Sequence, residues 1–459
     1  MDLRLSLAIL VGKTISILNK HTGTGGTAAP GLYALKIDPD LVKKLTTKIK
    51  YGNIVISGTN GKTTTARLIA DILSPKFQII HNRQGSNLLR GIASTLIAKV
   101  SLLGKLRADL GLWEVDEATL PEAIENTSPK IITLLNLFRD QLDRYGEIDT
   151  IRRKWQESIS KLSQDPTLIL NSDDPGISFL KRSFKGKVIY FGVEDKKLNL
   201  PEITHVADIS NCLNCESRLV YSTVLSAHMG HYACPKCHLQ RPKPQIAAID
   251  LKFNPDFSTF AKLNVNGQML NVRYALPGLY NVYNVLAAYT TGHALGIDPA
   301  TAKEKIEDFL AAFGRFQSVS IGNKSVVIFL IKNPAGANEV IRTIATKNKI
   351  NLLVILNDNI ADGRDVSWIW DTNWEILTPQ TKHLAISGTR CWDLAIRLKY
   401  GGLKLSKNNI YEDISYSLEN TLENMSSKDT LLILPTYTAL LEVQKSLAKL
   451  GGSSKWHKQ

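Results

Sequence analysis

Residues 54–73 read IVISGTNGKTTTARLIADIL and contain the strongest structural signal in the chain. An apolar run that ends at Ser57 is followed by a short glycine-containing turn, and three threonines then open a helical pattern. A strand, a turn and a helix in this order let backbone N–H groups and the positive end of the helix dipole face a polyphosphate. The stretch therefore predicts an α/β domain with a mostly parallel sheet, in which the first strand-to-helix turn binds ATP.

The residues that we expect to contact ATP form the turn and the start of the helix: Gly58, Thr59, Asn60, Gly61, Lys62, Thr63 and Thr64. Lys62 is expected to reach the β- and γ-phosphates, and the Thr63 hydroxyl is expected to bind Mg²⁺. The general P-loop pattern has a glycine where this chain has Ile56, so the match is to a shortened G-x-x-G-K-T form. An ordinary turn with a surface lysine is the weaker interpretation, because the strand, the helix and GKTTT are all in phase.

The chain has 459 residues, 44% of them apolar and 21% charged, which predicts two or three globular domains. Its net charge of +14 suits an anionic partner, such as a nucleotide, a nucleic acid or an acidic lipid surface, without choosing among them. The first segment, MDLRLSLAILVGKTISILNK, is apolar only as far as Gly12 and Lys13. This pattern favours an amphipathic helix over a signal peptide or a membrane span, and we expect a cytoplasmic protein.

From residue 51 the sequence alternates short apolar runs with helical patterns, which is typical of βαβ units. The alternation is interrupted between about residues 203 and 242, and a second series that begins near residue 324 predicts a separate doubly wound domain. We therefore expect a central ATP-binding domain at 51–314 with an insertion at 203–242, followed by a Rossmann-like domain at 315–459. Residues 1–50 are expected to form a helix and a glycine-rich loop that belong to the central domain.

Acidic and amide side chains follow two of the apolar runs. Glu114 and Asp116 end the run in LWEVDEA, at the position from which a parallel sheet delivers carboxylates to a metal ion. Asn136, Asp140 and Asp143 follow the next run in the same way. A solvated loop explains the first pair as an alternative, and helix N-capping explains one of the later aspartates.

Four of the five cysteines form two CxxC pairs that are separated by 18 residues: Cys212, Cys215, Cys234 and Cys237. In a chain without an export signal, this spacing predicts a zinc ribbon with four thiolate ligands rather than disulfides. Four protein ligands leave no open position on the metal, so the zinc is expected to be structural.

The histidines near this cluster, His228, His231 and His238, are expected to be surface residues, and Cys391 is expected to be buried. Zinc ribbons often bind nucleic acid, and that interpretation stays open on the residues alone. The interval RLVYSTVLSAHMGHYA is not strongly basic, however, and we expect no nucleic-acid partner.

Six motifs in their order along the chain resemble the ATP-dependent Mur ligase family: GTNGKTTT, WEVDEA, LLNLFRDQLDRYGE, NSDDP at 171–175, PGLYNVYNVLAA at 277–288 and GRFQ at 314–317. The resemblance implies that ATP phosphorylates a carboxylate and that a nitrogen nucleophile displaces the phosphate. It also implies catalytic roles for Lys62 and Glu114, and Mg²⁺ bound by Thr63 and Glu114. Asn281 and Asn284 are implied to lie beside the nucleotide, and Arg315 is implied to reach it from the domain junction.

Two departures from the usual family pattern narrow the resemblance. Only about 50 residues precede the P-loop, and KNPAGAN at 332–338 replaces the run that precedes the NP in amino-acid-adding ligases. With the cysteine insertion, these departures resemble the MurT-type branch of the family. That resemblance implies amidation of the D-glutamate α-carboxylate in the stem peptide of lipid II, with ammonia from a glutaminase partner, GatD.

No segment resembles a glutaminase nucleophile elbow, so the nitrogen is expected to arrive from a partner protein. The stretch NLLVILNDNIADGRDVSWIWD at 351–371 places several aspartates in one loop after a buried strand. Solvated turn chemistry and an acidic metal site are the alternatives for this loop. The resemblance implies that one aspartate, Asp365 or less strongly Asp362, completes a Cys-His-Asp triad whose other members belong to the glutaminase.

The sequence thus predicts an ATP-dependent amidating subunit of peptidoglycan synthesis, which forms a heterodimer with a glutaminase and acts on lipid II at the inner membrane leaflet. The basic charge and the first helix suit peripheral contact with an anionic membrane. Two alternatives stay open: an amino-acid-adding ligase of the Mur or folylpolyglutamate type, and a nucleotide-dependent adaptor that uses the zinc ribbon without catalysis.

Overall fold

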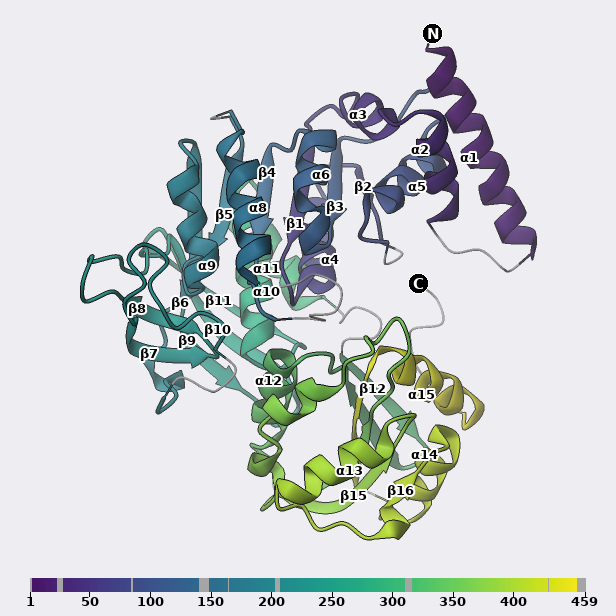
Figure 1. The fold of residues 1–459 in the computed structure, drawn as a ribbon, viewed down its shortest axis with the longest axis vertical. Helices are drawn as coiled ribbons and strands as arrows, with labels where there is room; N and C mark the ends of the chain where they lie inside the picture. Colours follow the sequence, from purple (N-terminus) through teal and green to yellow (C-terminus); the bar gives the residue numbers. More distant parts are fainter. Residues whose placement is uncertain are drawn as a thin grey trace.

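The computed structural model describes residues 2–22, 28–83, 86–139, 148–163, 165–202, 207–309, 316–347, 349–427 and 429–451. These residues form two large sheets with helices on both faces (Figure 1). The predicted α/β class with parallel sheets is confirmed. Asp140, Asp143 and Arg315 lie outside the described residues.

The first sheet has nine strands. In spatial order they are β11 (Gln268–Tyr274), β10 (Thr259–Val265), β9 (Ile246–Phe253), β6 (Lys187–Val193), β5 (Thr167–Asn171), β4 (Ile131–Leu134), β1 (Asn53–Ser57), β3 (Leu110–Glu114) and β2 (Ile79–His81). The strands from β2 to β9 pair in parallel, and β10 and β11 extend the edge as antiparallel hairpins. The sequence reading did not single out β9 to β11, although β10 alternates buried and half-buried side chains as a half-covered strand should.

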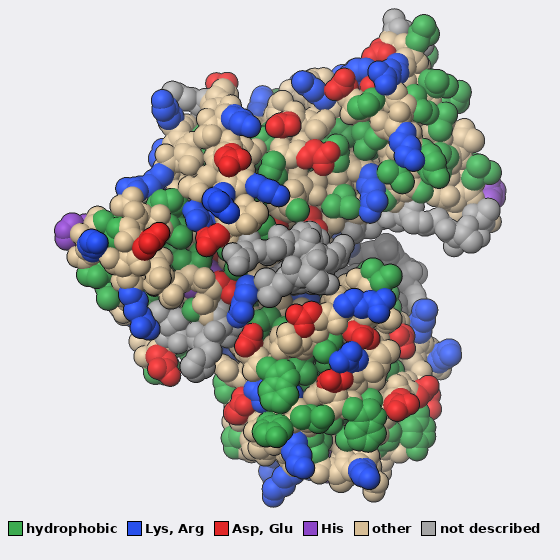
Figure 2. Space-filling model, in the orientation of Figure 1, with side chains coloured by type: hydrophobic (Ala, Val, Ile, Leu, Met, Phe, Trp, Pro, Cys, Tyr) green, Lys and Arg blue, Asp and Glu red, His purple; other side chains and the backbone are tan. Residues whose placement is uncertain are grey.

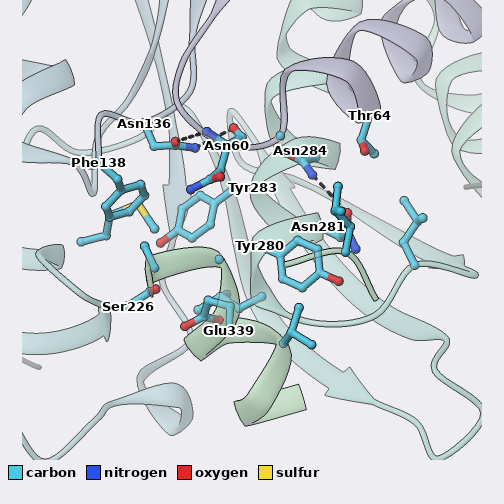
Figure 3. Close-up of a pocket in the computed structure, with 18 of the residues that line it drawn as sticks. Asn60, Thr64, Asn136, Phe138, Ser226, Tyr280, Asn281, Tyr283, Asn284 and Glu339 are labelled. Atoms are coloured by element: carbon cyan, nitrogen blue, oxygen red, sulfur yellow. Dashed lines mark hydrogen bonds between the residues drawn. The ribbon is translucent and has the colours of Figure 1, made fainter. Parts of the chain in front are cut away.

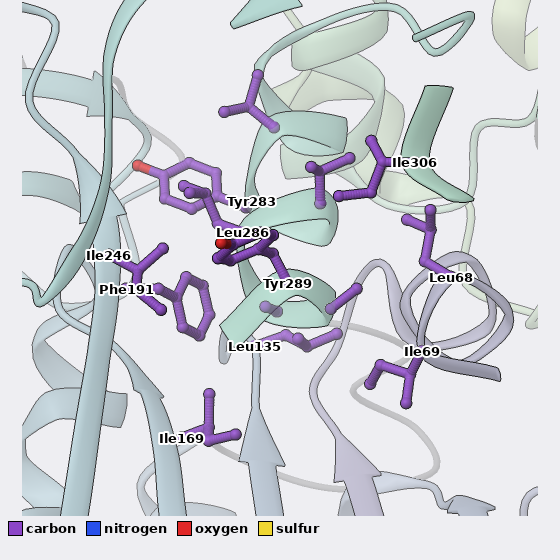
Figure 4. Packing of buried hydrophobic residues seen from close by; sticks show 14 of the residues in the cluster. Leu68, Ile69, Leu135, Ile169, Phe191, Ile246, Tyr283, Leu286, Tyr289 and Ile306 are labelled. Atoms are coloured by element: carbon purple, nitrogen blue, oxygen red, sulfur yellow. The ribbon is translucent and has the colours of Figure 1, made fainter. Parts of the chain in front are cut away.

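The central strands are apolar throughout because helices cover both faces of the sheet. Ile54 and Ile56 of β1 face one core, which contains α4 (Lys62–Leu73), α10 (Leu279–Ala294) and α11 (Pro299–Glu307). In Figure 4, Leu286 and Tyr289 of α10 lie between Phe191 of the sheet and Ile69 of α4. Val55 faces the opposite core, which contains α5 (Leu89–Lys99), α6 (Leu120–Thr127) and α8 (Ile148–Ser160). Successive side chains of a strand point to opposite faces of the sheet, and here each face is covered by a core. Every residue of the strand is therefore buried, which explains the continuous apolar run.

The N-terminal residues form more helix than the sequence predicted. Among the described residues, three helices precede β1: α1 (Leu3–Thr22), α2 (Ala29–Ile37) and α3 (Leu41–Thr46). Residues 29–31 are the end of HTGTGGTAAPG (21–31), the stretch for the expected glycine-rich loop, yet they begin α2 because Pro30 suits the first turn of a helix. A Cβ on Gly31 would lie 2.0 Å from the Arg90 carbonyl oxygen of α5, so this glycine permits close helix packing. Among the described residues, no helix combines the length and apolar character needed to cross a bilayer.

The second sheet has six strands in the order β12 (Phe316–Ile321), β13 (Lys324–Phe329), β17 (Thr430–Pro435), β14 (Ile350–Ile355), β15 (Thr381–Ser387) and β16 (Ile410–Tyr411). All pairs are parallel except β12 with β13. One face packs against α12 (Pro334–Ile344) and α13 (Cys391–Tyr400), and the other against α14 (Ile414–Glu423) and α15 (Tyr437–Lys449). Arg342 of α12 donates to the Leu225 and Leu198 carbonyl oxygens at 2.7 and 3.0 Å, which joins this domain to the central one.

Candidate active site

The turn between β1 and α4 depends on two glycines. Gly58 and Gly61 have φ angles of 147° and 88°, in the region that side chains disfavour. A Cβ on Gly61 would lie 2.0 Å from Asn284 Oδ1 of α10, so a larger residue would collide with the helix that flanks the turn. The two glycines therefore let the chain turn sharply into the N-terminus of α4 and let the turn pack closely against α10.

Lys62 lies across this turn and is almost fully buried. Its Nζ donates to the Gly58 carbonyl oxygen at 2.5 Å and lies 2.8 Å from Glu117 Oε2, with Asp116 Oδ1 at 4.0 Å. Burial is the largest single influence on Glu117 and favours its neutral form, but the positive charges of Lys62 and Lys332 and the hydrogen bonds with Asp116 and Lys62 together hold the pKa of Glu117 well below its ordinary value. A buried ammonium is thus held at the helix N-terminus by a carboxylate that stays ionised.

Thr63 and Glu114 meet at the same end of the sheet. The Thr63 hydroxyl donates to Glu114 Oε1 at 2.7 Å. The end of β3 is fixed because Asn82 accepts from the Glu114 N–H at 2.9 Å and donates to its carbonyl oxygen at 2.8 Å. A hydroxyl and a carboxylate are oxygen ligands of the kind that Mg²⁺ prefers, so this pair fits the predicted magnesium site.

Asparagine side chains connect the turn to its surroundings. Asn136 accepts from the Asn60 N–H at 2.8 Å and donates to its carbonyl oxygen at 3.0 Å. Asn333, the N-cap of α12 in the second domain, donates to Asn60 Oδ1 at 3.1 Å. Lys332 also donates to the Thr59 carbonyl oxygen at 3.3 Å. The P-loop therefore touches the second domain directly.

A pocket lies between the P-loop, α10 and α12, and Figure 3 shows side chains of all three around it. Asn281 and Asn284, for which nucleotide contacts are expected, line the pocket, and Asn284 accepts from the Thr65 hydroxyl at 3.2 Å. Asn281 is fixed in turn, because its amide donates to the Pro277 carbonyl oxygen at 2.7 Å. Asn60, Gly61 and Thr64 of the P-loop line the same pocket.

The far wall of this pocket contains groups that the sequence reading missed. Burial raises the pKa of Glu339, a carboxylate of α12. Tyr283 donates its hydroxyl to Asp173 at 2.8 Å, and Asp173 pairs at 2.5 Å with Arg241, near the end of the cysteine insertion. Ser226 of the insertion also lines the pocket. The insertion and the nucleotide pocket are therefore parts of one packed unit.

The four cysteines of the insertion converge. Their Sγ atoms all lie within 4.8 Å of one another, with 3.5 Å between Cys212 and Cys237 and 3.4 Å between Cys215 and Cys234. Tetrahedral zinc with Zn–S bonds of about 2.3 Å requires sulfur separations of about 3.8 Å, so the cluster fits a structural zinc ion. The hairpin of β7 (Val220–Ser226) and β8 (Met229–Ala233) joins the two CxxC turns.

The expectation that the nearby histidines are surface residues was wrong for His228. This side chain is fully buried, its Nε2 lies 3.6 Å from Asp174 Oδ2, and its ring centroid lies 4.8 Å from that of Phe138. It packs there because the hairpin folds back onto the central sheet. His231 is half-buried, with its Nε2 2.8 Å from the Val193 carbonyl oxygen. Cys391 is buried, as predicted.

We expect Cys234→Ser to lose a single bound zinc ion and to lower the midpoint of thermal unfolding by about 5 °C or more, because metal binding stabilises the folded insertion. Zinc analysis and calorimetry measure the two effects. Cys391→Ala is the matched control, since Cys391 is buried away from the cluster and its loss should leave the zinc content unchanged. Zinc-free wild-type protein with full thermal stability would contradict the assignment.

The aspartates of the 351–371 stretch have different surroundings. Asp362 is buried and accepts from the Thr438 N–H at 2.8 Å, so it caps the start of α15. Asp358 lies 3.3 Å from Arg390 Nη1. Asp365 is exposed and accepts from the Ser367 N–H at 2.8 Å through one oxygen, Oδ1. Asp365 therefore offers an accessible carboxylate, whereas Asp362 supports the fold.

The structure thus brings Lys62, Thr63, Glu114, Asn281 and Asn284 together and leaves Asp365 on the surface of the second domain. Glu117 was missed although it stands in WEVDEA, because carboxylate spacing alone does not tell which member pairs with a lysine 55 residues earlier. Asn333 was missed as well, and its only signal was the NP pair in KNPAGAN.

Comparison with known proteins follows the same division. A family model described as the Mur ligase middle domain matches residues 56–235, and one described as MurT ligase C-terminal matches residues 330–440. The chain is 34% identical, over 457 residues, to the MurT subunit of lipid II isoglutaminyl synthase (glutamine-hydrolyzing) from Staphylococcus aureus. That match covers 97% of this chain and 99% of the relative. The MurT subunit from Streptococcus pneumoniae is also 34% identical, with 98% of both chains covered.

Solved structures share the fold at lower identity. A pseudomurein peptide ligase type C from Methanothermus fervidus has a TM-score of 0.67 and 21% identity, with 88% of this chain and 80% of that chain covered. MurF ligase from Thermotoga maritima, solved with ADP, has a TM-score of 0.64 and 13% identity, with 91% and 84% covered. The likeness therefore extends over both sheets.

Proposed function

This chain belongs to the MurT family of Mur ligase-like proteins, and from that premise we propose that it amidates the D-glutamate α-carboxylate of the lipid II stem peptide with ATP and ammonia. The observation that carries the proposal is the 34% identity to MurT subunits, which runs through both domains. The names of those relatives supply the substrate and the use of glutamine. The P-loop geometry supports the use of ATP.

The proposed reaction has two steps. A carboxylate oxygen of the stem peptide attacks the γ-phosphorus of ATP, the bond to the β-phosphate oxygen breaks, and ADP leaves. The ammonia nitrogen then attacks the acyl carbon, inorganic phosphate leaves, and the nitrogen releases a proton. Lys62 is placed to stabilise the charge of the transferred phosphoryl group. Thr63 and Glu114 would hold Mg²⁺, which supplies further positive charge to the phosphates.

The contact between the two domains supports a closed site. Asn333 and Lys332 of the second domain donate hydrogen bonds to the P-loop residues Asn60 and Thr59. Arg342 holds the same helix against the cysteine insertion through Leu225 and against the segment before the insertion through Leu198. An acyl phosphate is destroyed by water, so a site that closes between the domains would protect it until ammonia arrives. Arg315, which lies outside the described residues, remains a proposed nucleotide contact.

A glutaminase of the GatD type is the proposed ammonia source, and its proposed docking site is the second domain at residues 315–459. Asp365 is the proposed third member of the glutaminase triad, where a carboxylate orients and stabilises a histidine. Its exposure on the second domain supports this role. The zinc ion is proposed to be structural, and the protein is proposed to be cytoplasmic and peripheral at the membrane.

We expect mass spectrometry to detect conversion of one stem-peptide carboxylate to a carboxamide when lipid II is incubated with this protein, MgATP and ammonium. Addition of a GatD-type partner should let glutamine replace ammonium. A control without ATP should give no product, because the carboxylate is then not activated. If neither ammonium nor glutamine gave a carboxamide, the amino-acid-adding and adaptor alternatives would be favoured. Addition of candidate amino acids would then distinguish these two alternatives.

A further inference from the structure

Helix α1 exposes apolar side chains on the side that faces away from the sheet. Its inner side packs Leu5, Ala8 and Ile9 into the core beneath α5. Its outer side exposes four large apolar residues by 80, 52, 52 and 57%, respectively: Leu3, Leu7, Leu10 and Ile17. Figure 2 shows hydrophobic side chains gathered over this part of the molecule. The helix is thus apolar on two sides, whereas a surface helix ordinarily has one apolar stripe.

The neighbouring helix α2 continues this surface. Leu32 and Tyr33 are exposed by 38 and 49%. Lys36 Nζ lies 5.5 Å from the centre of the Tyr33 ring. We call Leu3, Leu7, Leu10, Ile17, Leu32 and Tyr33 the outer face. Tyrosine and lysine suit the boundary between an apolar layer and water, because each combines an apolar body with a polar tip.

The N-terminal segment that carries the outer face is mostly positive in charge. The first 50 residues contain eight lysines and arginines and three aspartates. Two of these aspartates are neutralised by one lysine, since Lys44 Nζ lies 2.6 Å from Asp2 and 2.8 Å from Asp38. A second copy of this chain would bring like charges together. An anionic surface would complement both the charge and the apolar side chains.

We propose that the outer face of α1 and α2 docks on an anionic lipid bilayer, with α1 lying in the plane of the membrane surface. The choice of a bilayer over other anionic partners rests on the proposed function, in which the substrate is anchored to lipid. The four exposed residues of α1 enter the acyl boundary, while the lysines and arginines contact acidic headgroups. No helix that spans the membrane is required for this contact.

The test uses the full chain and vesicle flotation. The wild-type protein should bind vesicles of equal parts phosphatidylglycerol and phosphatidylcholine, and binding should weaken in high salt because screening reduces the attraction. Leu7→Glu combined with Leu10→Glu should weaken binding by about 100-fold or more, since apolar contact is lost and negative charge is added. Both side chains are half exposed, so thermal unfolding should change little. Ile396→Glu, on α13 with 53% exposure, is the matched control and should bind as the wild type does.

Activity separates failure of this inference from failure of the proposed function. The double variant should amidate lipid II in detergent micelles at the wild-type rate and should lose most activity on lipid II in vesicles. Equal vesicle binding by the variant and the wild type would overturn the docking surface. A dimer in light scattering that the double variant abolishes would also overturn it in favour of self-association. Absence of amidation in micelles by the wild type, with vesicle binding intact, would reject the proposed function alone.

Discussion

Lys62→Ala is expected to reduce ATP-dependent amidation by about 10³-fold, the largest effect of any substitution in the P-loop. Lys62 is the buried cation at the N-terminus of α4, where the transferred phosphoryl group is proposed to lie. Loss of a preorganised positive charge at such a position raises the barrier to phosphoryl transfer directly. The measurement is ADP release with lipid II and ammonium at saturating ATP, compared between the variant and the wild type.

The same substitution also leaves Glu117 buried and ionised without its partner at 2.8 Å. Removal of one member of a buried ion pair costs about 3–5 kcal/mol of stability, so a loss of activity could reflect unfolding. The double variant Lys62→Ala with Glu117→Gln removes the orphaned charge. We expect it to recover most of the thermal stability and none of the activity. Recovery of activity together with stability would show that Lys62 acts only through the fold.

Much of the fold could be predicted because the central strands are buried on both faces. β1 and β3 are buried at every residue, so their apolar runs stand out from the polar turns around them. The β10 strand was missed for the opposite reason. It lies near the edge of the sheet, where burial alternates and the pattern is weaker than a continuous run.

The candidate site could be predicted only where local chemistry imposes a pattern. Gly61 is required by a positive φ and by Asn284 close behind it, and this local requirement is visible as a motif. The pairing of Lys62 with Glu117 and the contact of Asn60 with Asn333 depend on how distant segments fold together. His228 looked like a polar residue in a zinc ribbon, yet the hairpin folds back and buries it.

Asp365→Asn is expected to reduce glutamine-dependent amidation by about 10⁴-fold in the presence of the glutaminase, with amidation from added ammonium unchanged. An asparagine in a triad cannot hold the histidine in the tautomer and charge state that the nucleophile needs. The ammonium route should be spared because Asp365 is exposed and does not line the pocket beside the P-loop. The measurement is carboxamide formation from each nitrogen source in parallel.

Asp362→Asn is the matched control, because it stands three residues earlier in the same loop and has a different task. Asp362 accepts from the backbone N–H of Thr438, so its loss weakens the cap of α15 by about 1 kcal/mol. We therefore expect a small loss of thermal stability and an equal, modest effect on both nitrogen sources. Asp362 would be the triad carboxylate if Asp362→Asn selectively reduced amidation from glutamine, while Asp365→Asn reduced amidation from glutamine and from ammonium equally. Selective loss in Asp365→Asn alone would support the assignment, since both variants change one carboxylate to an amide in the same loop.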